Sequence, residues 1–193
     1  MTRFFSRLLA AGAFGGGAVV FAVALGACGG GGGGSPSGGG DDGDDSTPFL
    51  AFAKDFTGYH SWQGLDVTGG ADLAGIHDGS TVIEYLNHEP PSGRSDFPKK
   101  TIIVKEATGG TIPHEIFAMV KRGAGFNSGL PGWEWFELEN IDDGSDRVNI
   151  VWHGFGPPNG EAYGGDSTNG CNTCHLACGN DGVCAKELAL ENF

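Results

Sequence analysis

The sequence predicts a mainly β protein, with an antiparallel sheet of about five strands and short helices near both ends of the folded part. Two observations lead to this fold class. Short runs rich in β-branched and aromatic residues recur along the chain, and clusters of Gly, Pro and Asn separate them. The intervals are too short for the crossover helices of a parallel sheet, so neighbouring runs should pair antiparallel. The five runs lie at residues 81–86, 101–106, 116–121, 133–138 and 147–152.

The N-terminal region is typical of an export signal. Residues 1–27 begin with Arg3 and Arg7, continue as an apolar stretch and end in small residues, as a secretory signal does. The four residues ending at Cys28, Leu-Gly-Ala-Cys, resemble a bacterial lipobox, in which the cysteine is diacylated and becomes the mature N-terminus. An uncleaved membrane-spanning anchor is the alternative for the same apolar stretch.

The remainder of the chain divides into a linker and one domain. Residues 28–47 start with the predicted lipidated Cys28 and consist mainly of Gly, Ser and Asp, a composition typical of disorder. Residues 48–193 are long enough for one domain with its own core. We therefore expect an exported, membrane-anchored lipoprotein, at the periplasmic face of the outer membrane or at the cell surface, in an oxidising compartment.

The formal net charge of the chain is −13 at neutral pH. Binding to nucleic acid requires basic patches that neutralise phosphates, so this charge disfavours nucleic acid as a partner. An acidic surface keeps a protein soluble, and it also suits docking to a basic redox partner protein.

Two stretches have helical character. Phe49, Phe52 and Phe56 recur at helical spacing, which predicts a short amphipathic helix within residues 49–59. Residues 186–192 predict a second short helix after the last strand. Helices are expected nowhere else in the folded part.

The residues that carry chemistry lie near the C-terminus, in the sequence Cys171-Asn172-Thr173-Cys174-His175. Cys-x-x-Cys-His is the attachment signature of a c-type haem. The two thiols add to the haem vinyl groups, and the histidine becomes the proximal ligand of the iron. We therefore expect one haem c per chain. Because the motif follows the sheet, its segment should pack across one sheet face, with the haem between His175 and strand side chains.

Other interpretations of the same residues stay open. The four cysteines Cys171, Cys174, Cys178 and Cys184 would also suffice for two disulfides without haem, or for a zinc site of four thiolates. Met119 or His153 would serve as a second axial ligand to an iron, which would give an electron-transfer cytochrome. For Met119 the simpler interpretation is core filling.

Five segments occur along the chain in this order: Phe97-Pro98, residues 101–106, Met119-Val120-Lys121, Trp133 with Trp135, and the terminal Cys-x-x-Cys-His. Taken together they resemble the cytochrome P460 family. They cover most of residues 59–184, and each is weak alone, but their order and spacing agree with the family. The resemblance implies a β-sheet c-type cytochrome, usually homodimeric, whose five-coordinate iron oxidises hydroxylamine or a similar small nitrogen compound. Non-enzymatic relatives, the β-fold cytochromes c′, bind nitric oxide or carbon monoxide.

The resemblance gives a role to Lys105. In P460 enzymes the lysine of the Val-Lys-Glu strand is cross-linked to the haem edge, and by position that lysine is Lys105. Strand alternation puts Lys105 on the same face as Thr101 and Ile103. A lysine on an apolar face either points into a pocket or extends its head group to solvent, and the solvated lysine is the alternative here.

This chain differs from the family pattern at two places: the side of the haem opposite His175, and two additional cysteines. Phe117 stands about where the enzymes carry a carboxylate, and an apolar cap resembles the gas-binding relatives. Glu115, two residues away on the same strand face, is then the only nearby candidate for proton transfer. The expected function is hydroxylamine-type oxidation, with nitric oxide or carbon monoxide binding as the alternative. Cys178 and Cys184 are extra, and in an oxidising compartment we expect them to form a disulfide.

Overall fold

The computed structural model describes residues 47–70, 79–123, 125–130, 132–158 and 170–193. All of them belong to one unit, Gly40–Phe193. The predicted export signal, Cys28 and the linker lie outside the described residues, apart from Thr47 at the linker's end. Within the described part of the chain, no helix has the length and apolar character needed to cross a membrane.

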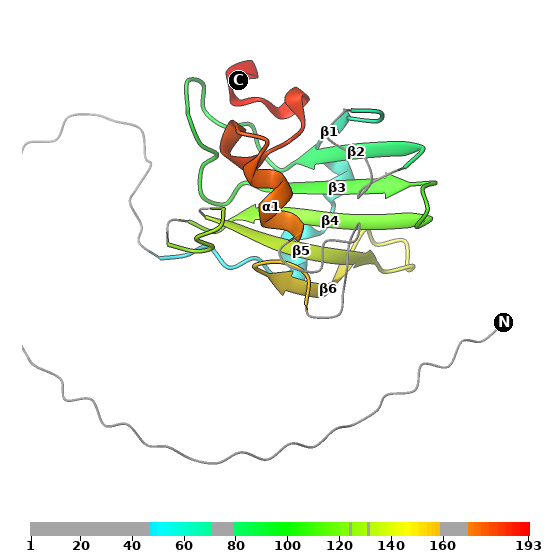
Figure 1. Ribbon diagram of the computed structural model, residues 1–193. Coiled ribbons are helices and arrows are strands. Elements are labelled where there is room, and N and C mark those ends of the chain that lie inside the picture. Colours follow the sequence, from blue (N-terminus) through cyan, green and yellow to red (C-terminus); the bar gives the residue numbers. More distant parts are fainter. Residues whose placement is uncertain (1–46, 71–78, 124, 131, 159–169) are drawn as a thin grey trace, which may run out of the picture. The chain divides into compact units, whose positions relative to one another are not determined.

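The domain is built on one six-stranded antiparallel sheet in which each strand pairs with the next along the chain (Figure 1). All five predicted strands are present, with ends that differ by up to two residues from the prediction. The expected number of five is wrong, because a sixth strand precedes them at one edge. The strands are β1 Gln63–Asp66, β2 Thr81–Leu86, β3 Ile102–Thr108, β4 His114–Lys121, β5 Trp133–Asn140 and β6 Val148–Gly154.

Strand β1 has no signal of its own in the sequence. Its residues, Gln-Gly-Leu-Asp, show neither β-branched side chains nor alternation. They become a strand by pairing antiparallel with β2, from Gln63 opposite Leu86 to Asp66 opposite Ile83. Tertiary pairing therefore decides the conformation of this edge, as is common for segments of weak β propensity.

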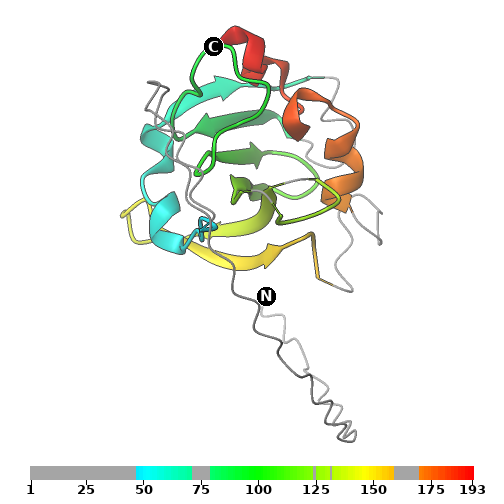
Figure 2. The same ribbon diagram turned by 90° about the vertical axis from the view of Figure 1, so that its left-hand side faces the viewer.

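The sheet buries both of its faces, which explains why its central strands are nearly continuous in apolar character. We call them the C-terminal face and the N-terminal face, after the segments that cover them on opposite sides of the sheet (Figure 2). The C-terminal face presents Val82, Leu86, Ile103, Ala107, Met119, Trp133 and Trp135 to the C-terminal segment. The N-terminal face presents Ile102, Val104, Ile116, Ala118, Val120, Phe136 and Leu138, which pack with Phe56 and Tyr59.

The N-terminal segment does not form the expected amphipathic helix. It forms two single 3-10 turns, η1 Ala53–Phe56 and η2 Tyr59–Ser61. Gly58 separates them in a left-handed conformation, with φ of 77°, which ends regular helix at that point. The phenylalanines therefore do not share one helix face: Phe56 is fully buried, whereas Phe52 is exposed.

Turn η2 is tied to the sheet through His60. Its Nε2 lies 3.0 Å from Glu106 Oε2, its Nδ1 contacts the carboxylate of Asp146, and His114 Nε2 lies 2.6 Å from the other oxygen of Glu106. Burial acts to lower the pKa of His60, but the hydrogen bond to Asp146 and the charge of Glu106 outweigh it and raise the pKa above its ordinary value.

Helical structure at the C-terminal end also differs from the prediction. The α-helix of the described residues is α1, Gly170–Leu176, which contains the Cys-x-x-Cys-His motif. The segment expected to be one helix forms two 3-10 turns, η5 Lys186–Leu188 and η6 Leu190–Asn192. They are split at Ala189, which is extended, and the side chain of Asn180 binds the carbonyl oxygen of Leu188 and the backbone N–H of Leu190 on either side of it.

Candidate functional site

Helix α1, which carries the two thiols and the imidazole of the motif, lies across one face of the sheet (Figure 1). Cys171 and Cys174 are thiols, the first partly buried against the apolar cluster and the second exposed. His175 follows directly, with its ring centroid 4.6 Å from that of Trp135 on β5. The motif therefore packs across one face of the sheet, which is the position expected from its place in the chain.

A polar clasp orients α1 on the sheet. Asn172 Oδ1 accepts hydrogen bonds from Trp135 Nε1 and from Asn127 Nδ2, each at 2.8 Å. Asn172 Nδ2 donates in return to Asn127 Oδ1 at 2.9 Å. Asn127 is almost fully buried, and it also donates to the carbonyl oxygen of Trp133. Buried polar groups with all their partners fix one arrangement, so this clasp determines which side of α1 faces the sheet.

The imidazole of His175 is held in a single tautomer. Its Nδ1–H donates to the carbonyl oxygen of Gly182 at 2.7 Å, and a carbonyl oxygen can only accept. Burial of the ring, together with the positive charge of Lys105, lowers the pKa of His175 to about 4. The ring is therefore neutral at physiological pH, and Nε2 carries the lone pair. Metal-binding histidines are typically prepared in this way, with the other nitrogen bound to a carbonyl or carboxylate.

The acceptor for His175 lies on a short loop that a disulfide closes. Cys178 and Cys184 are joined, as the sequence led us to expect, and Gly182 lies between them. Cys184 Sγ is 3.6 Å from His175 Nδ1. The disulfide is incompatible with the zinc site of four thiolates, because two of those ligands are used up. Among the residues that the structure describes, no group of three or more His, Cys, Asp or Glu is arranged to hold a metal ion by itself.

Lys105 points into the molecule rather than to solvent. Its side chain is 10% exposed, and its Nζ lies 3.0 Å from Glu84 Oε1 on β2, whose side chain is 5% exposed. The two residues are directly opposite each other in the sheet register. Glu84 Oε2 is buried without a hydrogen-bond partner in the described part of the chain. The solvated interpretation of Lys105 is therefore wrong, and its charge belongs to the same face as His175.

A row of side chains crosses the C-terminal face beside this pair. Lys105 is opposite Phe117, Phe117 is opposite Glu137, and Glu137 is opposite Trp152. Phe117 and Glu137 are half-buried, whereas Glu115 is buried and opposite Ala107. The expectation that Glu115 is the only nearby carboxylate is wrong, because Glu137 lies directly beside Phe117.

The two candidate second iron ligands fall on different faces. Met119 lies on the C-terminal face, opposite Trp135 and buried in the apolar cluster. His153 lies on the N-terminal face, where its ring stacks on Phe136 and its Nδ1 is 2.9 Å from Glu134 Oε1. His153 is thus separated from His175 by the sheet, so it is not a second axial ligand to an iron bound by His175 of the same chain.

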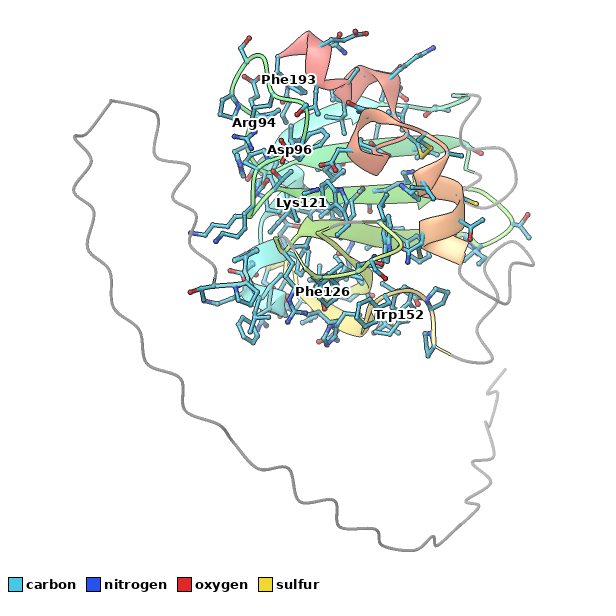
Figure 3. All side chains as sticks on the ribbon, turned by 60° about the vertical axis from the view of Figure 1, so that its left-hand side comes forward. Arg94, Asp96, Lys121, Phe126, Trp152 and Phe193 are labelled. Carbon is cyan, nitrogen blue, oxygen red and sulfur yellow. A yellow bond between two sulfur atoms is a disulfide. The ribbon has the colours of Figure 1, made fainter. Side chains whose placement is uncertain are left out.

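A cavity of about 490 Å³ lies beside α1, on the side of the helix away from its cysteines. Two exposed apolar side chains, Phe155 and Leu176, form part of its wall. Phe155 stacks on Phe126, which is labelled in Figure 3. His175 does not line it, so the cavity is distinct from the ligand side of the imidazole. The lining residues are Asn127, Ser128, Gly129, Phe155, Asn172, Thr173 and Leu176.

The sequence alone assigns no individual role to four residues of the site. Glu84 and Glu137 are visible in the sequence as unusual residues, because each occupies an inward-facing position of an alternating strand, where a buried carboxylate requires a compensating partner. Trp135 has a sequence signal only as part of the P460-like pattern. Asn172 had no signal, since its function depends on which side of α1 meets the sheet.

Compared with protein-family models, curated proteins and solved structures, the chain matches none of them. A function is therefore argued from the chemistry of the site itself.

Proposed function

We propose that this protein is an exported c-type haem protein, similar to cytochrome P460, that oxidises hydroxylamine or a similar small nitrogen compound. The observation that carries the proposal is the hydrogen bond from His175 Nδ1–H to Gly182, which leaves Nε2 with a lone pair for a metal. The same helix carries Cys171 and Cys174 as thiols. The haem would be held covalently by the two thiols, with His175 as the iron ligand.

The residues present fit such a group. Two thiols three positions apart and a neutral imidazole directly after them are the donors that haem c requires. The buried Glu84 Oε2, which has no partner among the described residues, gives the same face an unsatisfied polar atom. When bound, the haem would supply an iron that coordinates a small nitrogen ligand and takes up its electrons.

The chain's own residues would handle protons and water. Oxidation of hydroxylamine releases protons, and a carboxylate within reach of the ligand accepts them as a general base. Glu137 and Glu115 flank Phe117 on the C-terminal face and are the candidates. Phe117 would keep water away from the ligand, because an aromatic ring offers no hydrogen bond to hold it.

Lys105 would lie beside the haem in this proposal. Its head group is already turned into the C-terminal face, and its charge acts on the ring of His175. A covalent bond between Lys105 and the haem edge, as the family resemblance implies, can be tested by mass. The intact mass of the haem-loaded protein, compared with that of Lys105→Ala, would reveal one additional bond beyond the two thioethers.

The location and partners follow from the same proposal. Covalent attachment of haem c takes place outside the cytoplasm, which agrees with the predicted export signal and lipid anchor at Cys28. An acidic surface would suit a basic redox partner protein that removes the electrons. The family resemblance also allows a homodimer.

Covalent haem is the first experimental test. The full chain is exported in a host that attaches c-type haem, and bound haem is measured after denaturation. We expect one covalent haem per chain, and loss of it in the double variant Cys171→Ser/Cys174→Ser. The matched control, Cys178→Ser/Cys184→Ser, removes the same number of sulfur atoms and should retain covalent haem. A wild-type protein without haem would refute the proposed function.

A second candidate function is the reversible binding of nitric oxide or carbon monoxide without turnover. Phe117 favours it, because the family resemblance puts this aromatic side chain, which lies opposite Lys105 in the sheet, about where the P460 enzymes carry a carboxylate. The two functions are separated by hydroxylamine-dependent reduction of an electron acceptor. Turnover that falls about 10²-fold or more in Glu137→Gln supports the enzyme. Gas binding without turnover supports the alternative, and a low-spin iron would point to Met119 and electron transfer.

A further inference from the structure

The loop that supports His175 has an unusual backbone. Four consecutive residues, from Gly179 to Gly182, have positive φ angles of 63°, 44°, 54° and 85°. Two of them, Asn180 and Asp181, are not glycine. Asparagine and aspartate enter this region more readily than other residues with a side chain, but still at an energetic cost. A strained conformation of this kind persists only where surrounding contacts over-determine it.

Asp181 supplies those contacts. Both of its carboxylate oxygens accept hydrogen bonds from Lys121 Nζ, at 2.7 and 2.8 Å, and Oδ2 also accepts from the backbone N–H of Phe97 at 2.9 Å. Its carbonyl oxygen accepts from Trp133 Nε1 at 2.6 Å. The ion pair is largely buried, with side-chain exposures of 10% for Lys121 and 15% for Asp181.

These contacts anchor the loop to the ends of two central strands. Lys121 is the last residue of β4 (Figure 3), and Trp133 is the first residue of β5. The Lys121 ammonium also lies 4.9 Å from the centre of the Trp133 ring, so the three residues form one cluster. The cluster therefore fixes the position of the residue next to Asp181, which is Gly182.

We propose that Asp181 is a positioning residue for the iron ligand: held by Lys121 and Trp133, it keeps the Gly182 carbonyl against His175 Nδ1. This inference rests on the proposed function, because it treats His175 as the ligand. Hydrogen bonding at Nδ1 orients a ligating imidazole and makes it a better electron donor to the metal. A better donor stabilises ferric over ferrous iron, so the cluster lowers the reduction potential.

The experiment uses the haem-loaded full chain and the variant Asp181→Asn. Asparagine has the size of aspartate and tolerates the left-handed conformation, but it removes the charge that binds Lys121. We expect the Fe(III)/Fe(II) equilibrium to move about tenfold toward ferrous iron, a potential about 59 mV more positive, since outer partners of metal ligands have effects of this order. The iron–histidine stretching frequency of the ferrous protein should fall as well.

Asp143→Asn is the matched control. It removes the same charge from an exposed carboxylate whose partners are Ser145 and Arg147, on the turn between β5 and β6. We expect its potential and its stretching frequency to equal those of the wild type. A shift of equal size in both variants would mean that net charge alone acts, and it would overturn the inference.

Other outcomes separate this inference from the proposed function. A haem-loaded Asp181→Asn protein with unchanged potential and unchanged stretching frequency would show that the cluster only stabilises the fold, which overturns the inference and leaves the function intact. A wild-type protein without haem overturns both.

A second measurement covers the case in which the variant does not load haem. In the haem-free full chain, ¹⁵N shifts of the imidazole report which nitrogen of His175 carries the proton. We expect the Nδ1–H tautomer in the wild type and in Asp143→Asn, and a mixture of tautomers in Asp181→Asn. A single Nδ1–H tautomer in all three proteins would contradict the positioning role.

Discussion

Removing Lys105 should destabilise the protein strongly, because it would leave a carboxylate buried without a counter-ion. Lys105 Nζ and Glu84 Oε1 are 3.0 Å apart, and their side chains are 10% and 5% exposed. In Lys105→Met the volume and the apolar stem are kept, but Glu84 loses the only ionic partner it has in the described part of the chain. Its second oxygen already lacks a hydrogen bond there, so neither oxygen would be satisfied.

The size of the effect follows from the separation and the burial. Two unit charges at this distance attract by about 5–6 kcal/mol at an effective dielectric constant of about 20. Much of that attraction offsets the cost of removing both charges from water, so the intact pair contributes little net stability. Breaking such a pair from one side typically costs about 3–5 kcal/mol. For a domain of this size the midpoint of thermal unfolding should fall by roughly 10 °C.

A double-mutant cycle measures this directly. Lys105→Met, Glu84→Met and the double variant are unfolded with urea as haem-free full chains, and the free energies of unfolding are compared. Each single variant should lose about 3–5 kcal/mol, whereas the double variant should be close to wild type or more stable. Lys54→Met is the control, since Lys54 is exposed and its loss should change stability by less than about 0.5 kcal/mol.

Two results would refute this reasoning. If Lys105→Met costs no more than Lys54→Met, the ammonium is solvated and the buried ion pair does not exist in solution. If the double variant loses as much as the two single variants together, the residues do not interact, and their proximity on the C-terminal face has no energetic meaning.

Three further predictions concern the loop and the opposite face. Gly182→Ala should lower the free energy of unfolding in urea by about 2–4 kcal/mol, because the new Cβ would lie 2.7 Å from a methyl group of Leu130 and the alanine would have to keep a positive φ. In Gly179→Ala the new Cβ meets no atom, so the loss should be only about 1 kcal/mol, and equal losses in the two variants would contradict the steric argument. Replacing Cys178 and Cys184 by serine should cost about 2 kcal/mol, given a sequence separation of 6, and an unchanged urea midpoint would contradict it. Because the pKa of His60 is raised in the folded protein, His60 should add stability at pH values below its unfolded-state pKa, and this stability should be lost as the pH rises through the folded-state pKa. His60→Gln should abolish this pH dependence of the thermal midpoint. If the dependence persists in the variant, another group causes it.

Secondary structure was predicted correctly where a strand has its own alternating pattern. The prediction failed where contacts with residues outside the segment determine its conformation. Strand β2 is predicted to the residue, because its alternation and the prolines after it are local signals. The segment 186–192 has helix-forming residues, yet the side chain of Asn180 splits it into two turns. Local propensity cannot anticipate a hydrogen bond from a residue outside the segment.

The candidate site divides in the same way. The Cys-x-x-Cys-His pattern at residues 171–175 and the position of Lys105 on the same strand face as Ile103 follow from spacing and alternation alone. The partner of Lys105 does not, because Glu84 is brought opposite it by the register of two strands. Glu137 likewise becomes a neighbour of Phe117 only through the pairing of β4 with β5.

The sequence by itself determined the fold class, the face of each patterned strand and the donors at the C-terminal motif, because these depend on periodicity and on residue type. Tertiary structure alone decided the chemistry available to those donors. The tautomer of His175 depends on Gly182, whose position depends on Asp181 and on Lys121, and these contacts join residues up to 60 positions apart. Hydrogen bonds of that range exist only after the chain has folded, so no local pattern encodes them.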